Sequence, residues 1–247
     1  MSKNAIVTGG ARGLGGSMVL KLAEMGYNVV VNFVSDRSKA LSDDLIARVE
    51  KEYGVQGLAV QADVSDYHNC EKLVHSAVEK FGPKIDVLVN NAGIDNNKGF
   101  LDLTPEQYTK LIGVNLMSYL HCAHVVLPYM VEAKEGCIIN VSSVGGMMGV
   151  QNQVDYSAAK SGVIGFTRSL AVEFGRYNIR VNTISPGMIM TDMLRALGEN
   201  ELTALTKLVP IGKIGEAEDI SGCMEYLINA PYVTGQNLSP NGGAFMQ

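Results

Sequence analysis

The sequence predicts an α/β protein built on a parallel, doubly wound sheet. Short runs rich in β-branched residues alternate with longer stretches of helical periodicity along the 247 residues. Several short runs are apolar on both faces, Val29-Val30-Val31 and Val87-Leu88-Val89 among them, which is typical of strands covered on both sides. Because parallel strands need crossover connections, this alternation places helices on both faces of the sheet.

The expected elements follow one another in regular order. Strands are predicted at 5–8, 28–33, 57–62, 86–90, 136–141, 180–184 and 236–238. Helices are predicted at 13–26, 36–53, 66–81, 105–133, 153–176 and 216–229. The fourth helix opens with Thr104-Pro105-Glu106-Gln107, a capping box with proline at the first helical position.

The chain is expected to form a single domain over residues 1–247. No linker, charge block or internal repeat marks a boundary. The segment at about 188–214 breaks the rhythm, since it follows the sixth strand, is rich in Met and Leu, and has no clear partner strand. A stretch of this kind in a compact domain is usually functional, so it is predicted to be a substrate lid; an ordinary surface helical hairpin is the alternative.

Composition argues against several classes of protein. The content of 47% hydrophobic and 18% charged residues is that of a globular protein. The net charge of -5 and the lack of a basic run argue against nucleic-acid binding. Four scattered cysteines show no metal-ligand spacing, so no metal site is expected and a reducing, cytoplasmic location is favoured. No uninterrupted apolar run approaches the ~20 residues of a membrane helix, and no signal peptide is apparent.

A glycine-rich turn follows the first predicted strand and precedes the first helix. It reads Thr8-Gly9-Gly10-Ala11-Arg12-Gly13-Leu14-Gly15. Glycines there permit a tight turn, close approach of the backbone to a pyrophosphate, and close packing of helix on strand. The helix N-terminus offers free N–H groups to phosphates. The spacing GxxxGxG matches half of the GxGxxG fingerprint, and no GK[ST] follows, which excludes a P-loop. The position predicts a dinucleotide site rather than a purely structural turn.

The end of the second predicted strand indicates which dinucleotide binds. An acidic residue there would bind a ribose 2′-hydroxyl and favour NAD(H), whereas a nearby Arg can pair with a 2′-phosphate. Phe33 occupies this position, and Asp36 comes later, where a helix cap explains it better. Arg12 and Arg37 flank the expected pocket, and guanidinium groups suit phosphate. The sequence therefore favours NADP(H) over NAD(H).

Tyr156 and Lys160 form the YxxxK motif of the chain. On a helix, residues i and i+4 share a face. A phenol with a pKa near 10 is a poor base at neutral pH, but a neighbouring ammonium and the charge of an oxidised nicotinamide would stabilise phenolate and lower that pKa. Tyr156 is expected to protonate a carbonyl oxygen, or to deprotonate an alcohol, as a hydride moves.

Two serines end the fifth predicted strand, Ser142 and Ser143. In a doubly wound sheet, ligands bind outside the carboxyl ends of the strands. Ser143 is therefore expected to hydrogen-bond the developing alkoxide. Ser142 is the better candidate for capping the turn.

Together these motifs resemble the short-chain dehydrogenases/reductases, over the whole chain and in the expected order. The resemblance is carried by TGGARGLG at 8–15, Asp63-Val64, Asn90-Asn91-Ala92-Gly93, Asn115, Ser143, Tyr156, Lys160 and Ser185-Pro186-Gly187. It implies a Rossmann-type sheet of seven strands in the order 3-2-1-4-5-6-7. It also implies a homotetramer joined through helices 105–133 and 153–176.

The resemblance further implies a role for each candidate residue. Gly9, Gly13 and Gly15 cradle the pyrophosphate with backbone contacts from Leu14; Asp63 and Val64 hold the adenine; Asn91, Ala92 and Gly93 line the adenosine ribose; Pro186, Gly187, Ile189 and Thr191 lie beside the nicotinamide. Lys160 binds the nicotinamide ribose hydroxyls next to Tyr156. Asn115 holds a water that joins Lys160 to solvent, whereas a mid-helix Asn is otherwise neutral or costly.

Within the family, the chain is most similar to the 3-oxoacyl-[acyl-carrier-protein] reductases. The grounds are INVSSVGG at 139–146, NIRVNTISPGMIMTDML at 178–194, Asn241-Gly242-Gly243 and the chain length. That subfamily docks an acidic carrier on basic residues near the mouth of the site. Lys134 and Arg176 are candidates here, with simple solvation at helix ends as the alternative.

The leading hypothesis is therefore NADPH-dependent reduction of a 3-oxoacyl thioester, carried by acyl carrier protein or CoA. The first alternative is the same chemistry on another ketone or secondary alcohol, such as a steroid, sugar or xenobiotic. Substrate choice lies in residues 94–100, 145–155 and 188–214, and the fold does not decide it. A remote alternative is a non-catalytic dinucleotide-sensing protein, which is disfavoured because the Ser143, Tyr156 and Lys160 set is intact.

Overall fold

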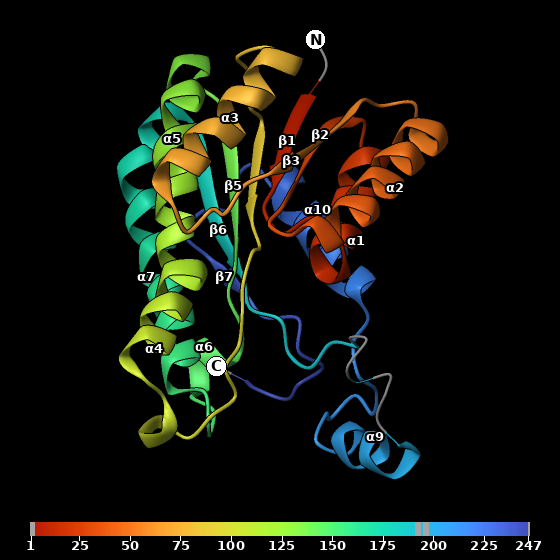
Figure 1. Ribbon diagram of the computed structural model, residues 1–247, viewed down its shortest axis with the longest axis vertical. Coiled ribbons are helices and arrows are strands. Elements are labelled where there is room, and N and C mark those ends of the chain that lie inside the picture. Colours follow the sequence, from red (N-terminus) through yellow and green to blue (C-terminus); the bar gives the residue numbers. More distant parts are fainter. Residues whose placement is uncertain (1–2, 191–193, 195–197, 247) are drawn as a thin grey trace.

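The computed structural model describes residues 3–190, 194 and 198–246, which contain a seven-stranded parallel sheet (Figure 1). The strands are β1 Lys3–Val7, β2 Tyr27–Phe33, β3 Gly57–Gln61, β4 Val87–Asn90, β5 Gly136–Val141, β6 Ile179–Ile184 and β7 Asn237–Leu238. Their order is β3-β2-β1-β4-β5-β6-β7, and every neighbouring pair is parallel. The predicted fold class and strand order are confirmed.

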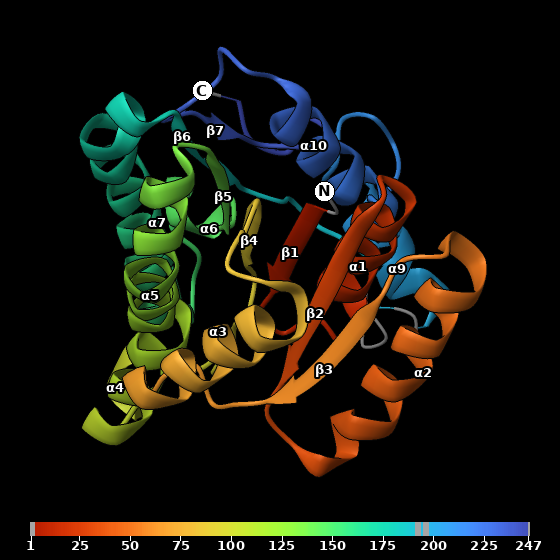
Figure 2. The same cartoon turned by 90° about the horizontal axis from the view of Figure 1, so that it is seen from above.

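Helices cover both faces of the sheet. They are α1 Gly13–Glu24, α2 Asp36–Tyr53, α3 Tyr67–Phe81, α4 Pro105–Ile112, α5 Ser118–Ala133, α6 Gly145–Met148, α7 Val154–Phe174, α9 Glu199–Thr206 and α10 Ala217–Asn229. Seen from above, α1, α2 and α10 lie on one side of the strands, and α3, α5 and α7 lie on the other (Figure 2). Short 3₁₀ turns occur at Phe100–Asp102 and Gly175–Tyr177.

The central strands are apolar on both faces because each face meets a helical layer. Alternate residues point to opposite sides of a strand. One core cluster holds Val7, Val31, Val89 and Ile139 against Met18 and Leu22 of α1 and Met224 of α10. The other holds Ile6, Val30, Leu88 and Ile138 against Leu73 of α3 and Val126 of α5. Packing on both faces holds the central strands in place, and with them the edge of the sheet that their carboxyl ends form.

The predicted helix 105–133 is not one uniform α-helix. Thr104 and Gln107 form the expected capping box, but Gly113–Met117 between α4 and α5 is a π-helical turn. By length and composition alone Pro105–Ala133 could span a membrane, a test that core helices of soluble proteins also pass. Tyr119 and Met130 of α5 are fully buried in the molecule, so here the helix serves as a core element.

The segment after β6 leaves the sheet at the carboxyl ends of the strands. Met190 N donates to the Gly215 carbonyl (2.8 Å) and Gly215 N donates to the Met188 carbonyl (3.1 Å), so the two ends of the predicted lid are tied together. Between them lies α9, which stands apart from the sheet in Figure 1. The lid itself stays a prediction.

Candidate active site

A cavity of about 350 Å³ opens at the carboxyl ends of β4, β5 and β6. Most of the predicted catalytic and nicotinamide-side residues line it. Its lining is Leu14, Asn91, Gly93, Ile94, Asp95, Val141, Ser142, Ser143, Tyr156, Lys160, Pro186, Gly187 and Ile189. Residues far apart in the chain therefore converge on one hollow at the edge that the sheet topology indicates.

The glycine turn is built to bring backbone segments very close together. Gly9 has a φ of +61° and Gly13 a φ of +56°, a left-handed conformation that side chains disfavour. A Cβ at Gly15 would overlap the Gly9 carbonyl oxygen and lie 2.7 Å from Asn91 Nδ2. A Cβ at Gly13 would meet nothing within 4 Å. The turn thus has no room for a side chain at Gly15, where it packs against the protein, but has free space at Gly13.

The segment after β4 is anchored to this turn through Thr8. The backbone N–H groups of Asn91 and Ala92 donate to Thr8 Oγ1 at 2.9 and 3.1 Å, and Asn91 Nδ2 donates to the Thr8 carbonyl at 3.0 Å. Gly93 follows at the cavity wall. Asn91 and Ala92 therefore hold the glycine turn and the central strand in register.

The residues predicted to select the dinucleotide lie beside the glycine turn. Phe33 is buried at the end of β2, while Arg12 at the N-cap of α1 and Arg37 in the first turn of α2 are exposed. Neither guanidinium takes part in an ion pair among the described residues. Asp36 does not cap α2 with its side chain, because its carboxylate accepts from Gln61 Nε2 at 3.0 Å. Both arginines are available to an anion.

Asp63 and Val64 lie just after β3, and each has a structural contact of its own. The Asp63 carboxylate accepts from the backbone N–H and the hydroxyl of Ser65, at 3.0 and 2.7 Å. Val64 is buried and its carbonyl accepts from Cys70 Sγ. Contact with an adenine stays a prediction for both residues.

The two serines after β5 make different contacts, and it is Ser143, not the expected Ser142, whose hydroxyl caps the turn. Ser142 is buried and its hydroxyl donates to the Lys160 carbonyl at 2.8 Å, which ties the strand end to α7. Ser143 Oγ accepts from the backbone N–H of Gly145 at 3.0 Å. A Cβ on Gly145 would lie 3.4 Å from Ser143 Oγ and 3.6 Å from Tyr156 Cε1. Ser143 and Tyr156 therefore face the same part of the cavity.

Burial dominates the electrostatics of Tyr156. Burial raises the pKa of the phenol, and the nearby Asp95 carboxylate raises it further, while hydrogen bonding with Ser143 lowers it. Desolvation of the phenolate outweighs the other influences here, and the lowering expected from Lys160 together with an oxidised nicotinamide stays a prediction. The neutral phenol is the favoured form of Tyr156.

Lys160 is only 3% exposed. Its Nζ donates to the Val141 carbonyl at 2.8 Å and to the Tyr119 hydroxyl at 3.1 Å, and lies 5.8 Å from the centre of the Tyr156 ring. Burial lowers the pKa of the ammonium to about 7. The sequence places Lys160 on the correct face, but Tyr119 was not predicted. The sequence signal for Tyr119 was its position four residues after Asn115, the same spacing as between Tyr156 and Lys160.

Asn115 occupies the middle of the π-helical turn and is fully buried. Its Oδ1 accepts from the Ile94 N–H and its Nδ2 donates to the Ile94 carbonyl, both at 2.8 Å. A Cβ on Gly93 would lie 3.6 Å from Asn115 Oδ1 and 3.7 Å from Lys160 Nζ. Asn115 thus fixes the loop beside Lys160, and its role in a water relay stays a prediction.

The loop after β6 closes the far side of the cavity. The Pro186 carbonyl accepts from Val144 N at 3.0 Å, and Gly187 N donates to the Pro240 carbonyl at 3.1 Å. A Cβ on Gly187 would lie 2.6 Å from Asn241 Cβ, so this position needs glycine. Ile189 lines the cavity. The predicted contact residue Thr191 lies outside the described residues.

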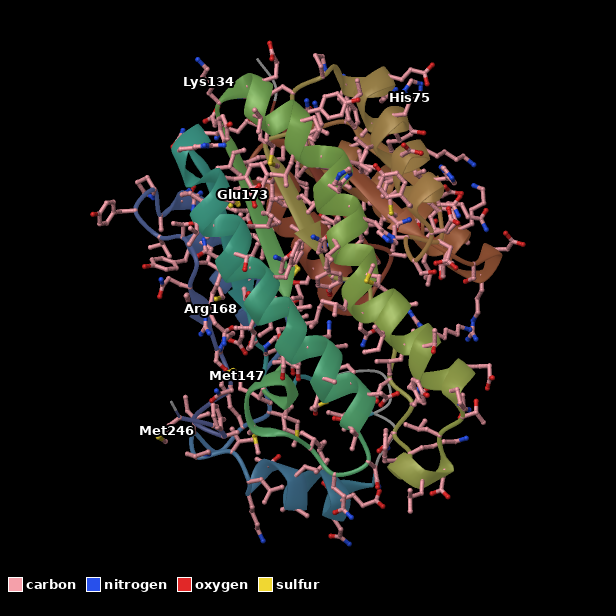
Figure 3. The ribbon with its side chains drawn as sticks, turned by 90° about the vertical axis from the view of Figure 1, so that its left-hand side faces the viewer. His75, Lys134, Met147, Arg168, Glu173 and Met246 are labelled. Atoms are coloured by element: carbon pink, nitrogen blue, oxygen red, sulfur yellow. The ribbon has the colours of Figure 1, made fainter. Side chains whose placement is uncertain are left out.

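Lys134 and Arg176 do not lie near the mouth of the cavity. Lys134 ends α5 just before β5 begins at Gly136, and Arg176 lies just before β6 begins at Ile179. Both are therefore at the amino ends of strands whose carboxyl ends form the site. Figure 3 shows Lys134 and Met147 at well-separated heights of the molecule. The expected placement near the mouth is wrong within one chain, because helices return antiparallel to the strands.

The described residues contain no cluster of three or more His, Cys, Asp or Glu side chains suited to a metal. The groups assembled here instead combine a phenol, a hydroxyl, a buried amine and a glycine turn. Such a set can hold an anionic cofactor and transfer a proton at a carbonyl or alcohol oxygen.

Comparisons with known proteins agree with this geometry. Residues 3–202 match the model of the short chain dehydrogenase family. A 3-oxoacyl-[acyl-carrier-protein] reductase of Staphylococcus epidermidis is 37% identical over the full length of both chains. An acetoacetyl-CoA reductase of Rhizobium meliloti is 37% identical, with 99% of each chain covered. The crystal structure of a putative short-chain alcohol dehydrogenase from Sinorhizobium meliloti superposes with a TM-score of 0.90 at 33% identity, covering 99% of this chain and 97% of that one.

Proposed function

Because this chain belongs to the short chain dehydrogenase family, we propose that it is an NADPH-dependent carbonyl reductase acting on a 3-oxoacyl thioester. The observation that carries the proposal is the convergence of Ser143, Tyr156 and Lys160 on one cavity beside Gly187. The family and the relatives establish an oxidoreductase that uses a nicotinamide dinucleotide. The choice of NADPH and of substrate is the proposal.

The chain offers a fitting cradle for the dinucleotide. Because Gly15 has no room for a side chain, the surface of the turn is made of backbone. The N-terminal N–H groups of α1 are presented at the same place. The exposed guanidinium groups of Arg12 and Arg37 would hold a 2′-phosphate. Asp63 and Val64 would border the adenine, and Asn91 to Gly93 the ribose. When bound, the reduced nicotinamide supplies a hydride.

The catalytic residues would then handle a proton at the substrate oxygen. The neutral phenol of Tyr156 would donate its proton to the carbonyl oxygen, and Ser143 would hydrogen-bond the same oxygen as charge develops. The neutral form of Tyr156 carries the proton that the reductive direction requires. Lys160 would stabilise the phenolate that forms and bind the ribose hydroxyls, with Asn115 fixing the adjacent loop.

A second candidate is the same reaction on a free ketone or secondary alcohol. Two observations favour it: the solved neighbour is described as a short-chain alcohol dehydrogenase, and Lys134 and Arg176 lie at the strand ends opposite the cavity. A protein-borne acyl group would need another docking surface. An acyl-CoA, by contrast, would fit both the relatives and the geometry.

We further propose that the protein works in the cytoplasm as a homotetramer. Figure 3 shows α5 and α7 side by side on one outer face, with Arg168 and Glu173 labelled on α7. Val172 of the same helix is 87% exposed although apolar. Gly165, where a Cβ would meet nothing within 4 Å, would let another helix approach closely. Light scattering of the purified chain tests the oligomeric state directly.

The experiment that tests the proposed function is a rate comparison on the purified chain. An acetoacetyl thioester, a hydroxysteroid ketone and a small ketone are each offered with NADPH and with NADH. We expect the highest kcat/KM for the thioester with NADPH. A higher kcat/KM for a free ketone would overturn the substrate proposal. Equal or higher rates with NADH would overturn the cofactor proposal. No turnover with any substrate would overturn the proposed reaction and leave the non-catalytic, dinucleotide-binding alternative.

A further inference from the structure

A second tyrosine reaches the catalytic lysine from the other side. Tyr119, in the first turn of α5, is completely buried. Its hydroxyl accepts from Lys160 Nζ at 3.1 Å and donates to the Val141 carbonyl at 3.0 Å. Lys160 Nζ donates to the same carbonyl at 2.8 Å and lies 5.0 Å from the centre of the Tyr119 ring. The three groups form a closed triangle of hydrogen bonds.

This triangle is where the buried charge finds its stabilisation. Lys160 has no carboxylate partner among the ion pairs of the described residues. An ammonium buried without a counter-ion depends on neutral oxygens and aromatic faces for its stability. Tyr119 provides one of each, and the Val141 carbonyl provides the second oxygen.

The other titratable groups around Lys160 are few. Tyr156 faces it from its own helix, and Cys122 lies one turn beyond Tyr119, where its Sγ contacts Cys70. The buried carboxylate of Asp155, on the same helix, has other partners: it accepts from Asn96 Nδ2 at 2.7 Å and from the backbone N–H of Tyr156. Asp95 lies across the cavity and bonds Gln153.

We propose that Tyr119 is a positioning residue that holds the Lys160 ammonium toward the Val141 carbonyl and stabilises its positive charge. The hydroxyl is the part that matters, since it completes the triangle. The phenyl ring supplies packing and the aromatic face, which phenylalanine would keep. The consequence for catalysis rests on the proposed function, because it assumes that protonated Lys160 supports Tyr156 during turnover.

Two variants separate the hydroxyl from the ring. Tyr119→Phe removes the hydrogen bond and retains the ring. Tyr129→Phe makes the same change further along α5, where the ring is partly buried and packs against the core. A hydrogen bond to a charged group is worth enough to move a pKa by about one unit. We therefore expect Tyr119→Phe to lower the pKa of Lys160 by about one unit, and Tyr129→Phe to leave it unchanged.

The first readout does not depend on activity. The full chain is labelled with ¹³C at lysine Cε and titrated by NMR without added dinucleotide, and Lys160 is assigned by its absence in Lys160→Met. A Lys160 pKa that is the same in Tyr119→Phe and in the parent overturns the proposal. If Tyr119→Phe fails to fold, Tyr119→Met, which also lacks the hydroxyl, takes its place in the same titration and must lower the Lys160 pKa.

The second readout is the pH profile of kcat/KM. Loss of the hydroxyl should move the alkaline limb to lower pH by about the same unit, with little change in rate at the acidic plateau. A uniform loss of rate at every pH would mean that Tyr119 is merely structural and would overturn the proposal. Absence of turnover in the parent would refute the proposed function while the NMR result still decides the role of Tyr119.

Discussion

The glycine turn (residues 9–15) and the catalytic wall (Tyr119, Ser143, Tyr156 and Lys160) border the same site but are shaped by different forces. At the turn, the constraint is space: a single added carbon at Gly15 would overlap a backbone carbonyl. At the wall, the constraint is charge: the amine of Lys160 and the phenol of Tyr119 are buried, and the phenol of Tyr156 is partly buried beside them.

This difference decides how each region responds to change. Steric constraint is local and depends on which atoms touch, so neighbouring glycines can differ completely. Electrostatic constraint depends on the whole surroundings, because desolvation acts on a group from every side.

The largest effect is expected for Tyr156→Phe. Loss of a positioned general acid lowers rates by about 10²–10⁴-fold, so kcat should fall by that order with the best substrate of the panel. Dinucleotide affinity, measured by fluorescence titration, should change little because the hydroxyl acts mainly in the transition state. The same change at the exposed Tyr232 is the matched control. Retained turnover would remove Tyr156 from the mechanism.

Lys160→Met should make the folded protein more stable at acidic and neutral pH. The pKa of Lys160 is lowered to about 7 from its ordinary 10.5, so below pH 7 both states are protonated and the folded state bears the whole desolvation cost. Between these values the folded state releases its proton first, and stability rises with pH. Removing the amine should therefore add a few kcal/mol at about pH 6 and much less near pH 10.

Denaturant unfolding of the parent and of Lys160→Met at about pH 6 and about pH 10 measures this difference in the free energy of unfolding. Tyr156 contributes little to it, because its raised pKa keeps the phenol neutral in this range. A variant that is less stable than the parent at the acidic value would contradict the assignment of Lys160 as a desolvated charge. It would indicate that the triangle with Tyr119 more than compensates for burial.

Gly15→Ala should destabilise the glycine turn, whereas Gly16→Ala should not. The Cβ at Gly15 would meet the Gly9 carbonyl and Asn91, while at Gly16 its nearest neighbour would be 3.8 Å away. Overpacking typically costs about 1–3 kcal/mol, and alanine in a helix gains roughly 0.5–1 kcal/mol over glycine. The midpoint temperature of thermal unfolding and the affinity for NADPH should both fall for Gly15→Ala, and neither should fall for Gly16→Ala. Equal behaviour of the two variants would break the steric account of the turn.

Arg12→Ala and Arg37→Ala should each weaken the preference for NADPH by about tenfold, from the loss of a charge-assisted hydrogen bond. The value of kcat/KM with NADPH should fall and that with NADH should hold. Arg48→Ala, on the same helix as Arg37 but paired with Glu52, is the control. Parallel losses with both dinucleotides would show that the arginines do not read the 2′-phosphate.

The sequence predicts most of the fold because its strongest patterns are local. Doubly apolar strands and the capping box at Thr104 appear where expected. The start of β1 is missed because Lys3 and Asn4 are polar. Asn4 belongs to the strand through long-range bonds, to Asp86 Oδ2 at 2.8 Å and from Asn28 Nδ2 at 3.0 Å. The pattern of residues within the first strand cannot reveal partners that lie far away in the sequence.

The candidate site divides in the same way. The glycine turn and the YxxxK pair are visible because their spacing alone dictates geometry. Tyr119 is hidden, since an aromatic residue in an apolar helix predicts core packing, and only the fold brings its hydroxyl to Lys160. The opposing effect of burial on the pKa of Tyr156 is hidden for the same reason: sequence neighbours indicate the ammonium, but not the depth of burial.

The π turn at Gly113–Met117 constrains how the length of this chain can vary. A π turn holds one residue more than an α-helical turn, and it sits where Asn115 meets Ile94. Dropping one residue there would restore an even α-helical ladder and swivel α4 by about 100° around the axis of α5. The number of residues in this stretch therefore matters as much as the identity of Asn115 within it.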